Sequence, residues 1–444
     1  MKGYLILSHL AIALSIAQKA FALGFDEQQQ QPLRIETENE QPVAKPNIIF
    51  ILVDDQDSLL DSISYMPNLN KHLTQQGTFY RNHFVTTAIC CPSRVSLLTG
   101  RLAHNTNVTD VSPPYGGYLK FVERGFNENY LLVWLQNAGY NTLYTGKLFN
   151  SHTIDNYNKS FANGYEGQYT TDILKEKSLR FLDSAISHED PFFLTIAPVA
   201  PHSNVLSNGP LVPGADLSFS ASNISGKAKT SFRGCQDSPQ RLRALQPVDE
   251  LISEITDVLN EKSILDNTYI IYTSDNGYHI GQHRLQAGKE CGFEEDIRVT
   301  FIIRGPGILP NYEETAVTTH IDIAPTIFDI AGLPLRSDFD EDYGELDDRE
   351  LLGVSLEKVV HRLDALLLVL QSCQKQNCIR PWDVLHPEGK VNTLKDALHE
   401  KYGDFYQVQS KVSFSRCEYG YIPDAEGPQT GLTYRDGVEW HQWV

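Results

Sequence analysis

NIIFILV, at residues 47–53, is a continuous apolar run rich in β-branched side chains, and Asp54 and Asp55 follow it directly. A strand that is buried on both faces of a parallel sheet has this composition. Similar runs predict further strands at 142–145, 192–197, 269–273 and 299–303. Segments of helical period lie between them, at 130–137, 171–186 and 242–260. Strands that alternate with helices predict an α/β domain with a mostly parallel sheet.

The composition excludes several classes of protein. Of 444 residues, 41% are hydrophobic and 10% are aromatic, which is too apolar for a disordered chain and enough for two or three domains. The 56 acidic and 37 basic side chains give a formal net charge of −19. Because nucleic-acid binding needs a basic face, we expect no nucleic acid partner. Any anionic ligand must therefore be held by a local cluster of positive groups.

The N-terminal segment predicts secretion. Lys2 precedes an apolar stretch at 4–17 and the small-x-small sequence AFA at 20–22, which together predict a signal peptide over residues 1–22. A signal anchor is the alternative, but the stretch is shorter than the roughly 20 residues of a membrane span. We expect an extracellular protein that has no membrane segment after cleavage.

Shifts in composition predict the other boundaries. Residues 23–45 are polar and Gln-rich, which predicts a disordered lead-in. The strand and helix patterns lie within 46–336. Asp and Glu dominate residues 337–350, which predicts a solvated acidic linker before a smaller C-terminal subdomain at 351–444.

The cysteines and sequons fit an extracellular protein. The seven cysteines are Cys90, Cys91, Cys235, Cys291, Cys373, Cys378 and Cys417. Disulfides persist outside the cytosol, and an odd number leaves at least one cysteine unpaired. Cys373 and Cys378 are close enough in sequence for a short bridge, but the connectivity stays open. Three Asn-x-Ser/Thr sequons, at Asn107, Asn158 and Asn223, predict a glycoprotein.

Adjacent oxygen donors follow two of the predicted strands. Asp54 and Asp55 come after the first strand, and Asp275 and Asn276 come after the strand at 269–273. Ligands of open α/β sheets collect at the carboxyl ends of the strands. Four hard oxygen donors suit Ca²⁺ or Mg²⁺ better than Zn²⁺. The alternative is that these residues are ordinary helix caps or turns.

The segment TAICCPSRVSLLTGR, residues 87–101, predicts an anion site. Pro92 is expected as the first residue of a helix that Gly100 ends, so Cys90 lies at the positive end of the helix dipole. Arg94 adds a bidentate positive group. Two alternatives stay open: Cys90 and Cys91 are structural disulfide partners, or Cys90 is a thiolate nucleophile. The Cys-x3-Arg spacing does not match the Cys-x5-Arg loop of cysteine phosphatases.

Three more positive groups follow strand-like runs in the same way. Lys147 comes after the run at 142–145, His202 after the run at 192–197, and Lys289 thirteen residues beyond Asn276. Each one taken alone is an ordinary surface or capping residue. Together they are predicted at the same end of the sheet as the acids.

These residues match a known family. CCPSR at 90–94, with LTGR at 98–101, resembles the sulfatase signature Cys-x-Pro-Ser-Arg followed by Leu-Thr-Gly. Further segments resemble the family in the same order: 46–57, Gly146-Lys147, 200–203, 274–281 and 322–326. The resemblance thus covers nearly the whole chain from residue 46. It implies an alkaline-phosphatase-like α/β fold, with a large mixed sheet flanked by helices and a smaller C-terminal α+β subdomain.

The resemblance also implies a mechanism. Cys90 would be converted to formylglycine by the formylglycine-generating enzyme, and the hydrate would attack sulfur and form a covalent sulfate hemiester that then releases sulfate. One Ca²⁺ per chain would be held by Asp54, Asp55, Asp275, Asn276 and the modified Cys90. Arg94 would orient the hydrate, Lys147 and Lys289 would bind sulfate oxygens, and His202 would protonate the leaving group. Positive groups of this kind stabilise the charge that develops on the departing oxygen.

Several segments bear on the substrate class. The segments 277–283 and 294–299 resemble the branch that contains secreted fungal-type arylsulfatases and glucosamine-6-sulfatases, and the segments 424–429 and 440–443 are more similar to the arylsulfatases. We therefore expect hydrolysis of aryl sulfates. A sugar sulfatase of the N-acetylglucosamine-6-sulfatase type is the first alternative. Hydrolysis of phosphate mono- or diesters, or a catalytically silent protein that binds sulfated ligands, are the others.

The sequence departs from the family in three places. Many sulfatases have a histidine two residues after the motif lysine, whereas Leu148, Phe149 and Asn150 follow Lys147 here, so Asn150 or His152 is a candidate for that role. The region 161–169 is compressed relative to the family. Thr300 stands where the family usually has proline.

Overall fold

The computed structural model describes residues 45–152, 170–202, 234–339 and 356–411, apart from residues 189, 281, 286, 371, 372, 374–376, 378 and 379. The predicted signal peptide, the compressed region 161–169 and most of the Gln-rich lead-in and of the acidic linker lie outside these residues. The predicted domain boundaries stay predictions.

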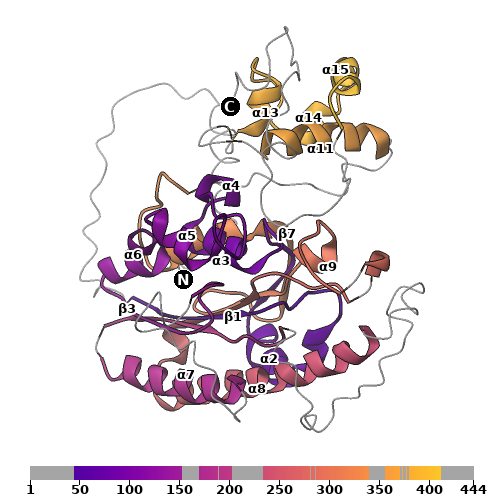
Figure 1. Cartoon of the computed structure of the whole chain (residues 1–444). Coiled ribbons are helices and arrows are strands. Elements are labelled where there is room, and N and C mark those ends of the chain that lie inside the picture. Colours follow the sequence, from indigo (N-terminus) through magenta and orange to yellow (C-terminus); the bar gives the residue numbers. More distant parts are fainter. Residues whose placement is uncertain are drawn as a thin grey trace, which may run out of the picture.

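A seven-stranded sheet forms the centre of the molecule (Figure 1), in the order β3-β4-β1-β5-β6-β2-β7. The strands are β1 (Asn47–Val53), β2 (Thr78–Phe84), β3 (Asn141–Gly146), β4 (Phe192–Ala197), β5 (Thr268–Ser274), β6 (Phe301–Arg304) and β7 (Tyr312–Thr319). Only β6 runs antiparallel to its two neighbours, and every other pair is parallel. The predicted mixed, mostly parallel sheet is therefore confirmed.

The five predicted strands correspond to β1, β3, β4, β5 and β6. The last of them starts at Phe301, two residues later than predicted. We did not predict β2 and β7, because the sequences TFYRNHF and YEETAVTT lack a continuous apolar run. β7 lies at the edge of the sheet and exposes most of its residues, and an edge strand needs no apolar pattern on both faces.

Helices cover both faces of the sheet (Figure 1), with α7 and α8 on one face and α3, α5 and α6 on the other. The helices of this domain are α2 (Pro67–Leu69), α3 (Cys90–Thr99), α4 (Ala103–Thr106), α5 (Gly117–Glu123), α6 (Leu131–Asn137), α7 (Thr170–Ile186), α8 (Gly234–Glu261), α9 (Glu294–Ile297) and α10 (Ile323–Ile330). Alternate residues of β1 enter the two hydrophobic cores: Ile48, Phe50 and Leu52 pack toward α3, α5, α6 and α10, and Ile49, Ile51 and Val53 pack toward α2, α7 and α8. The apolar run of β1 is continuous because neither face meets water.

Two predicted helix boundaries are wrong. α3 begins at Cys90, with Ile89 as an extended N-cap, and not at Pro92. α8 begins at Gly234, eight residues before the predicted start. The predicted end of α3 is confirmed, because Gly100 follows it with φ 62°. A Cβ atom at Gly100 would lie 2.5 Å from the Phe339 ring, so this turn needs glycine for its backbone and for its space.

The C-terminal residues form a separate hydrophobic cluster around Trp382 and Tyr406. The elements described there are helices: α11 (Leu356–Leu370), α13 (Pro381–Leu385), α14 (Leu394–Ala397) and α15 (Gly403–Gln407). The described residues of this region include no strand, so the predicted α+β subdomain stays a prediction. Cys373 is disulfide-bonded, and its carbonyl lies 2.9 Å from His104 Nε2 in α4. No helix in the described part of the chain is long and apolar enough to cross a membrane.

Candidate active site

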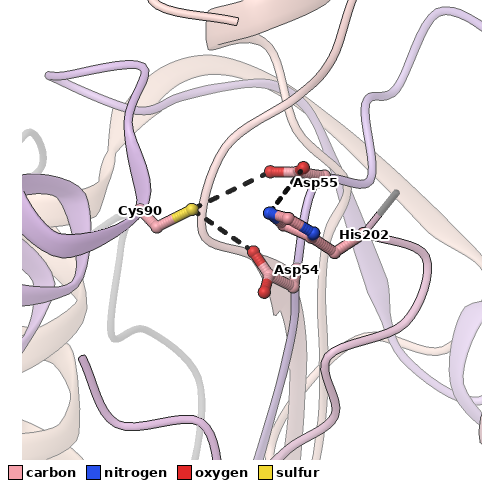
Figure 2. A group of neighbouring side chains, drawn as sticks. All are labelled: Asp54, Asp55, Cys90 and His202. Atoms are coloured by element: carbon pink, nitrogen blue, oxygen red, sulfur yellow. Dashed lines mark hydrogen bonds and ion pairs between the residues drawn. The ribbon is translucent and has the colours of Figure 1, made fainter. Parts of the chain in front are cut away.

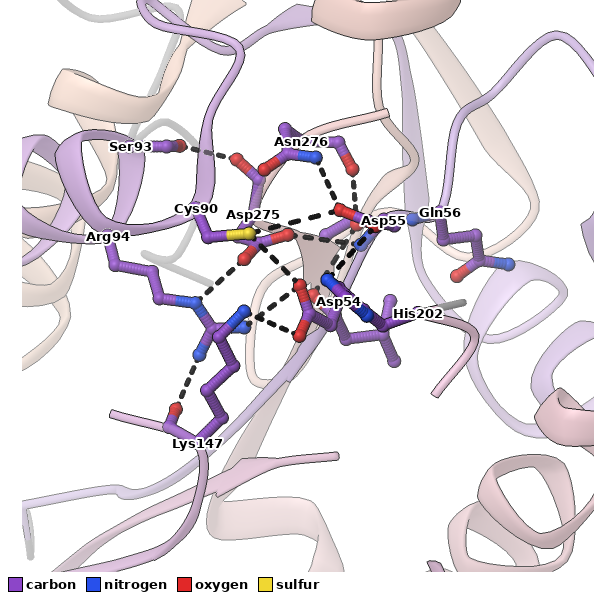
Figure 3. Close-up of polar contacts among 12 residues, drawn as sticks. Asp54, Asp55, Gln56, Cys90, Ser93, Arg94, Lys147, His202, Asp275 and Asn276 are labelled. Carbon is purple, nitrogen blue, oxygen red and sulfur yellow. Dashed lines mark hydrogen bonds and ion pairs between the residues drawn. The ribbon is translucent and has the colours of Figure 1, made fainter. Parts of the chain in front are cut away.

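The two predicted pairs of oxygen donors lie side by side at the carboxyl ends of β1 and β5 (Figure 3). The strands pair in parallel with Val53 opposite Ser274, so the residues that follow them meet at one edge of the sheet. The amide of Asp55 donates to Asp275 Oδ1 at 3.1 Å, and Asn276 Nδ2 donates to Asp55 Oδ1 at 2.7 Å. All of these side chains, and that of Asp54, are fully buried.

Cys90 faces this group from the first turn of α3 (Figure 2). Its Sγ lies 3.4 Å from Asp54 Oδ1 and 4.0 Å from Asp55 Oδ1. Lys289 Nζ lies 2.6 Å from the same sulfur. Neither Cys90 nor Cys91 is part of a disulfide, so the structural-disulfide alternative is wrong.

The surroundings of Cys90 keep its thiol protonated. Burial raises the pKa of Cys90 well above its usual value, and the charges of Asp54 and Asp275 raise it further, while Lys147 opposes them. A thiolate next to several buried carboxylates is unfavourable, and a neutral thiol is a weak nucleophile. The unmodified side chain is therefore poorly suited to the thiolate mechanism.

Arg94 is the fixed positive group of the site. It is fully buried, and its Nε donates to Asp275 Oδ2 at 2.8 Å. Burial lowers the pKa of Arg94, but the charges of Asp275 and Asp54 outweigh burial and raise it. Within the described part of the chain, its buried Nη2 donates no hydrogen bond, although it lies 4.0 Å from Asp54 Oδ1. A donor left in this way is available to a bound group.

Lys147 reaches the site because β3 ends on a glycine. Gly146 has φ 103°, and a Cβ atom there would lie 2.0 Å from the Ala197 carbonyl oxygen. The chain therefore turns tightly against β4, and Lys147 N donates to that carbonyl at 2.8 Å. Lys147 Nζ then donates to Asp54 Oδ2 at 2.7 Å. Lys289 contacts Asp55 Oδ1 in the same manner, so each lysine pairs with one of the two adjacent aspartates.

His202 approaches the group from the end of β4. Its amide donates to the Val199 carbonyl at 2.9 Å, and its Nε2 lies 3.7 Å from Asp55 Oδ2. Its side chain is 25% exposed, whereas that of Asp55 is fully buried, so the imidazole lies on the solvent side of the group. The structure thus brings together all of the predicted site residues: Asp54, Asp55, Cys90, Arg94, Lys147, His202, Asp275, Asn276 and Lys289.

Comparisons with known proteins identify the family. The sequence model of the Sulfatase family matches residues 46–333. The chain belongs to the sulfatase family. An arylsulfatase of Chlamydomonas reinhardtii is 31% identical over 84% of this chain and 82% of its own length. The human N-acetylglucosamine-6-sulfatase is 31% identical over 66% of this chain and 62% of its own length. An extracellular sulfatase SULF-1 homologue of Drosophila melanogaster is 33% identical over 71% of this chain and 32% of its own length.

The fold of this sulfatase is that of solved members of the family. The protein BT4656, solved in complex with its substrate D-glucosamine-2-N,6-O-disulfate, has a TM-score of 0.53 at 22% identity, covering 67% of this chain and 78% of that one. The alkaline-phosphatase-like sulfatase fold is thereby confirmed. The protein is a sulfuric ester hydrolase.

Sulfatases generally depend on formylglycine and on a metal ion. The residues of this site fit such an ion. Asp55 Oδ2 and Asn276 Oδ1 are buried and accept no hydrogen bond from the described residues. Burial raises the pKa of Asp54, but Lys147, helped by Arg94, lowers it to about 2, so this carboxylate is ionised at neutral pH. Ionised and unpaired oxygens in a buried group are what a hard divalent cation needs.

Arg241, which the sequence does not mark as a site residue, connects the segments that carry the site. Its guanidinium donates to the carbonyls of Asp55 and Pro201, and it stacks 4.8 Å from the centre of the Tyr278 ring. Arg241 is 6% exposed and lies in α8, one residue before the predicted helical segment at 242–260, where one arginine gives no signal of its own. Its contacts show that it holds the backbone on both sides of the site, next to Asp55 and next to His202.

Two further departures from the family lie in described residues. Thr300 is fully buried, and its Oγ1 has no hydrogen-bond partner among the described residues. The carbonyl of Asn150 accepts from Tyr118 N at 2.9 Å, and the His152 ring packs 4.2 Å from the Tyr118 ring. Asn150 and His152 therefore both contact α5, and a role for either in the site stays a prediction.

Proposed function

We propose that this sulfatase is a secreted, calcium-dependent arylsulfatase that hydrolyses aryl sulfate esters to a phenol and inorganic sulfate. The observation that carries the proposal is the position of Cys90, whose side chain meets two carboxylates and a lysine at the start of α3. The likeness to the Chlamydomonas arylsulfatase over 84% of the chain supports aryl sulfates as the substrate class. The signal sequence at 1–22 and the extracellular Drosophila relative support secretion.

Cys90 is proposed to act as formylglycine after conversion by the formylglycine-generating enzyme. The hydrated aldehyde supplies the oxygen nucleophile that attacks sulfur. Arg94 Nη2, which is buried without a hydrogen bond, would donate to this hydrate and hold its attacking oxygen in one orientation. The raised pKa of the unmodified thiol supports the need for such a conversion.

The charged side chains would bind the ester and stabilise its transition state. Lys147 and Lys289 lie next to Cys90 and its carboxylates, where each can donate to a non-bridging sulfate oxygen. Asp54, Asp55, Asp275 and Asn276 would hold Ca²⁺, which supplies fixed positive charge beside the sulfate group. Positive groups in a buried site stabilise developing negative charge far more than they do in water.

His202 is proposed to protonate the departing oxygen. Its imidazole lies on the solvent side of Asp55, at 3.7 Å, where a leaving group that points away from Cys90 would lie. General-acid help of this kind is worth about 10²–10⁴-fold in rate.

Peptide mass and substrate choice test the proposal together. We expect the peptide that contains Cys90, from protein expressed with the formylglycine-generating enzyme, to be about 18 Da lighter than the unmodified peptide, as replacement of the thiol by an aldehyde requires. The same protein should hydrolyse nitrophenyl sulfate much faster than nitrophenyl phosphate. Full sulfatase turnover with an unmodified Cys90 would contradict the formylglycine mechanism.

The same assays separate the other functions. Faster cleavage of N-acetylglucosamine-6-sulfate than of aryl sulfates would favour a sugar sulfatase, which the human relative supports. Preference for nitrophenyl phosphate would indicate a phosphate ester hydrolase. Protein that carries the aldehyde and calcium but cleaves no sulfate ester would be a silent binding protein.

Replacement of His202 by alanine should lower kcat by an amount that depends on the leaving group. We expect kcat for alkyl or sugar sulfates to fall by about 10²–10⁴-fold, and kcat for nitrophenyl sulfate to fall much less, because nitrophenolate leaves without a proton. A series of aryl sulfates of rising phenol pKa measures this. His283→Ala is the matched control, since His283 is more exposed and pairs with Glu295. An equal loss on every substrate would exclude a general-acid role.

A further inference from the structure

The loop that carries Lys289 is tied to the rest of the molecule on both sides of this lysine. His279 N donates to the Gly288 carbonyl at 2.8 Å, and Gly288 N donates to the His279 carbonyl at 2.9 Å. On the other side, Glu290 N donates to the Ala88 carbonyl at 2.9 Å. Whatever fixes this loop therefore also fixes the position of Lys289.

An imidazole, a thiol and a carboxylate meet within this loop. The candidate ligand atoms of His279, Cys291 and Asp296, hereafter the loop cluster, lie within 4.8 Å of one another. His279 is 3% exposed, Asp296 is fully buried and Cys291 is partly buried. His279 Nδ1 lies 2.7 Å from Asp296 Oδ1, and Cys291 N donates to Asp296 Oδ2 at 2.9 Å. The thiol of Cys291 is not in a disulfide.

The donor set of the loop cluster differs from the oxygen set at the strand ends. One sulfur, one nitrogen and one carboxylate oxygen suit Zn²⁺, which binds Cys, His and Asp, and suit Ca²⁺ poorly. A tetrahedral zinc ion with bonds of about 2.0–2.3 Å holds its ligand atoms roughly 3.3–3.8 Å apart. The three side chains therefore reach one ion with shifts of about 1 Å, and binding releases to solvent the proton of the Cys291 thiol and the proton between His279 and Asp296.

Glu290 lies between Lys289 and Cys291 in this loop. Its backbone has φ 85°, a conformation that is strained for a residue with a side chain. A water can complete four-coordination, because His279, Cys291 and Asp296 are the described side chains whose ligand atoms gather there.

We propose that His279, Cys291 and Asp296 bind a zinc-type divalent cation, separate from the metal at the strand ends, and that this ion fixes the loop that carries Lys289. The cation would bind side chains at three points of one loop, residues 279, 291 and 296. Without the ion, only hydrogen bonds join these points. Only the consequence for Lys289 rests on the proposed function, because binding of the ion does not require sulfatase chemistry.

Cobalt binding tests the site without catalysis. The probe is CoCl₂, added to a Cys90→Ala variant in excess Ca²⁺, because Cys90 and His202 also lie in a group that could bind a metal. We expect one equivalent of Co²⁺ to bind, with a thiolate-to-cobalt charge-transfer band and the visible bands of tetrahedral cobalt. ZnCl₂ should displace the cobalt and remove both bands.

Matched variants in the same background identify the ligands. Cys291→Ser and His279→Asn should each abolish the thiolate band. Cys91→Ser and His283→Asn should retain it, since Cys91 is buried in the core of α3 and His283 pairs with Glu295. The proposal is overturned if no band forms, or if the band survives in Cys291→Ser.

Hydrogen exchange tests the effect on the loop. Zinc should slow amide exchange in the peptide at 287–293 by at least about tenfold, because a loop that is held by a bound ion opens less often. The slowing should disappear in Cys291→Ser. Zinc binding with unchanged exchange would overturn the link to Lys289, and neither result depends on whether the substrate is an aryl sulfate.

Discussion

Replacement of Cys90 by alanine is expected to lower kcat/KM for nitrophenyl sulfate by at least about 10⁴-fold, because loss of a covalent nucleophile removes nearly all of the chemical step. The remaining groups, Arg94, Lys147 and Lys289, still bind the ester but have no attacking oxygen to orient. Steady-state kinetics on the purified variant, with protein concentration checked by absorbance, measure the loss. KM should change far less than kcat.

Cys91→Ala is the control for this variant. Cys91 is the adjacent residue and is equally buried, but it packs in the hydrophobic core around α3 and α6. We expect it to lose about 1–2 kcal/mol of stability through its small cavity and to keep kcat/KM within about tenfold. If Cys91→Ala were as inactive as Cys90→Ala, both losses would reflect damage to α3. If Cys90→Ala retained activity, the proposed nucleophile would be wrong.

Replacement of Asp55 by asparagine should abolish the response of the protein to calcium. Asp55 Oδ1 accepts from Asn276 and contacts Lys289, while Oδ2 is buried without a hydrogen bond. Removal of one ligand charge should weaken calcium binding by at least about 100-fold, since even outer-shell partners contribute about 10–100-fold. Activity at limiting calcium should fall in parallel. Thermal unfolding with and without calcium measures the binding directly, because a ligand of the folded state raises Tm.

Asp57→Asn is the matched control for the metal prediction. Asp57 is also buried and also follows β1, but its Oδ1 accepts from the amides of Leu59 and Leu60 at 2.9 and 2.6 Å. Burial raises the pKa of Asp57 to about 6, against the effect of Arg241, so asparagine resembles its protonated form. The calcium-dependent rise in Tm should persist in this variant. If both variants lost the rise in Tm, the effect of calcium would depend on packing at the end of β1 in general and not on Asp55 as a ligand.

The sequence predicted the parts of the fold that are buried on both faces. β1, β4 and β5 are continuous apolar runs because each lies in the middle of the sheet, and a pattern of this kind is visible without any knowledge of the partners. β2 and β7 were not predicted, because their sequences TFYRNHF and YEETAVTT have no continuous apolar run and they become strands by pairing with each other, as Thr78 does with Tyr312. Only tertiary contact decides such strands.

The candidate site divides in the same way. The sequence alone indicated which residue types gather in the candidate site, because carboxylates and cations follow predicted strands whose carboxyl ends meet at one edge of the sheet, as at Asp54 and Lys147. The tertiary structure decided which lysine faces which aspartate, that the Cys90 thiol meets two carboxylates and a lysine, and that Arg241 connects two backbone segments. It also brought His279 to Cys291 and Asp296. These relations are set by packing across the sheet and by loop closure, which depend on distances in space that a linear pattern does not encode.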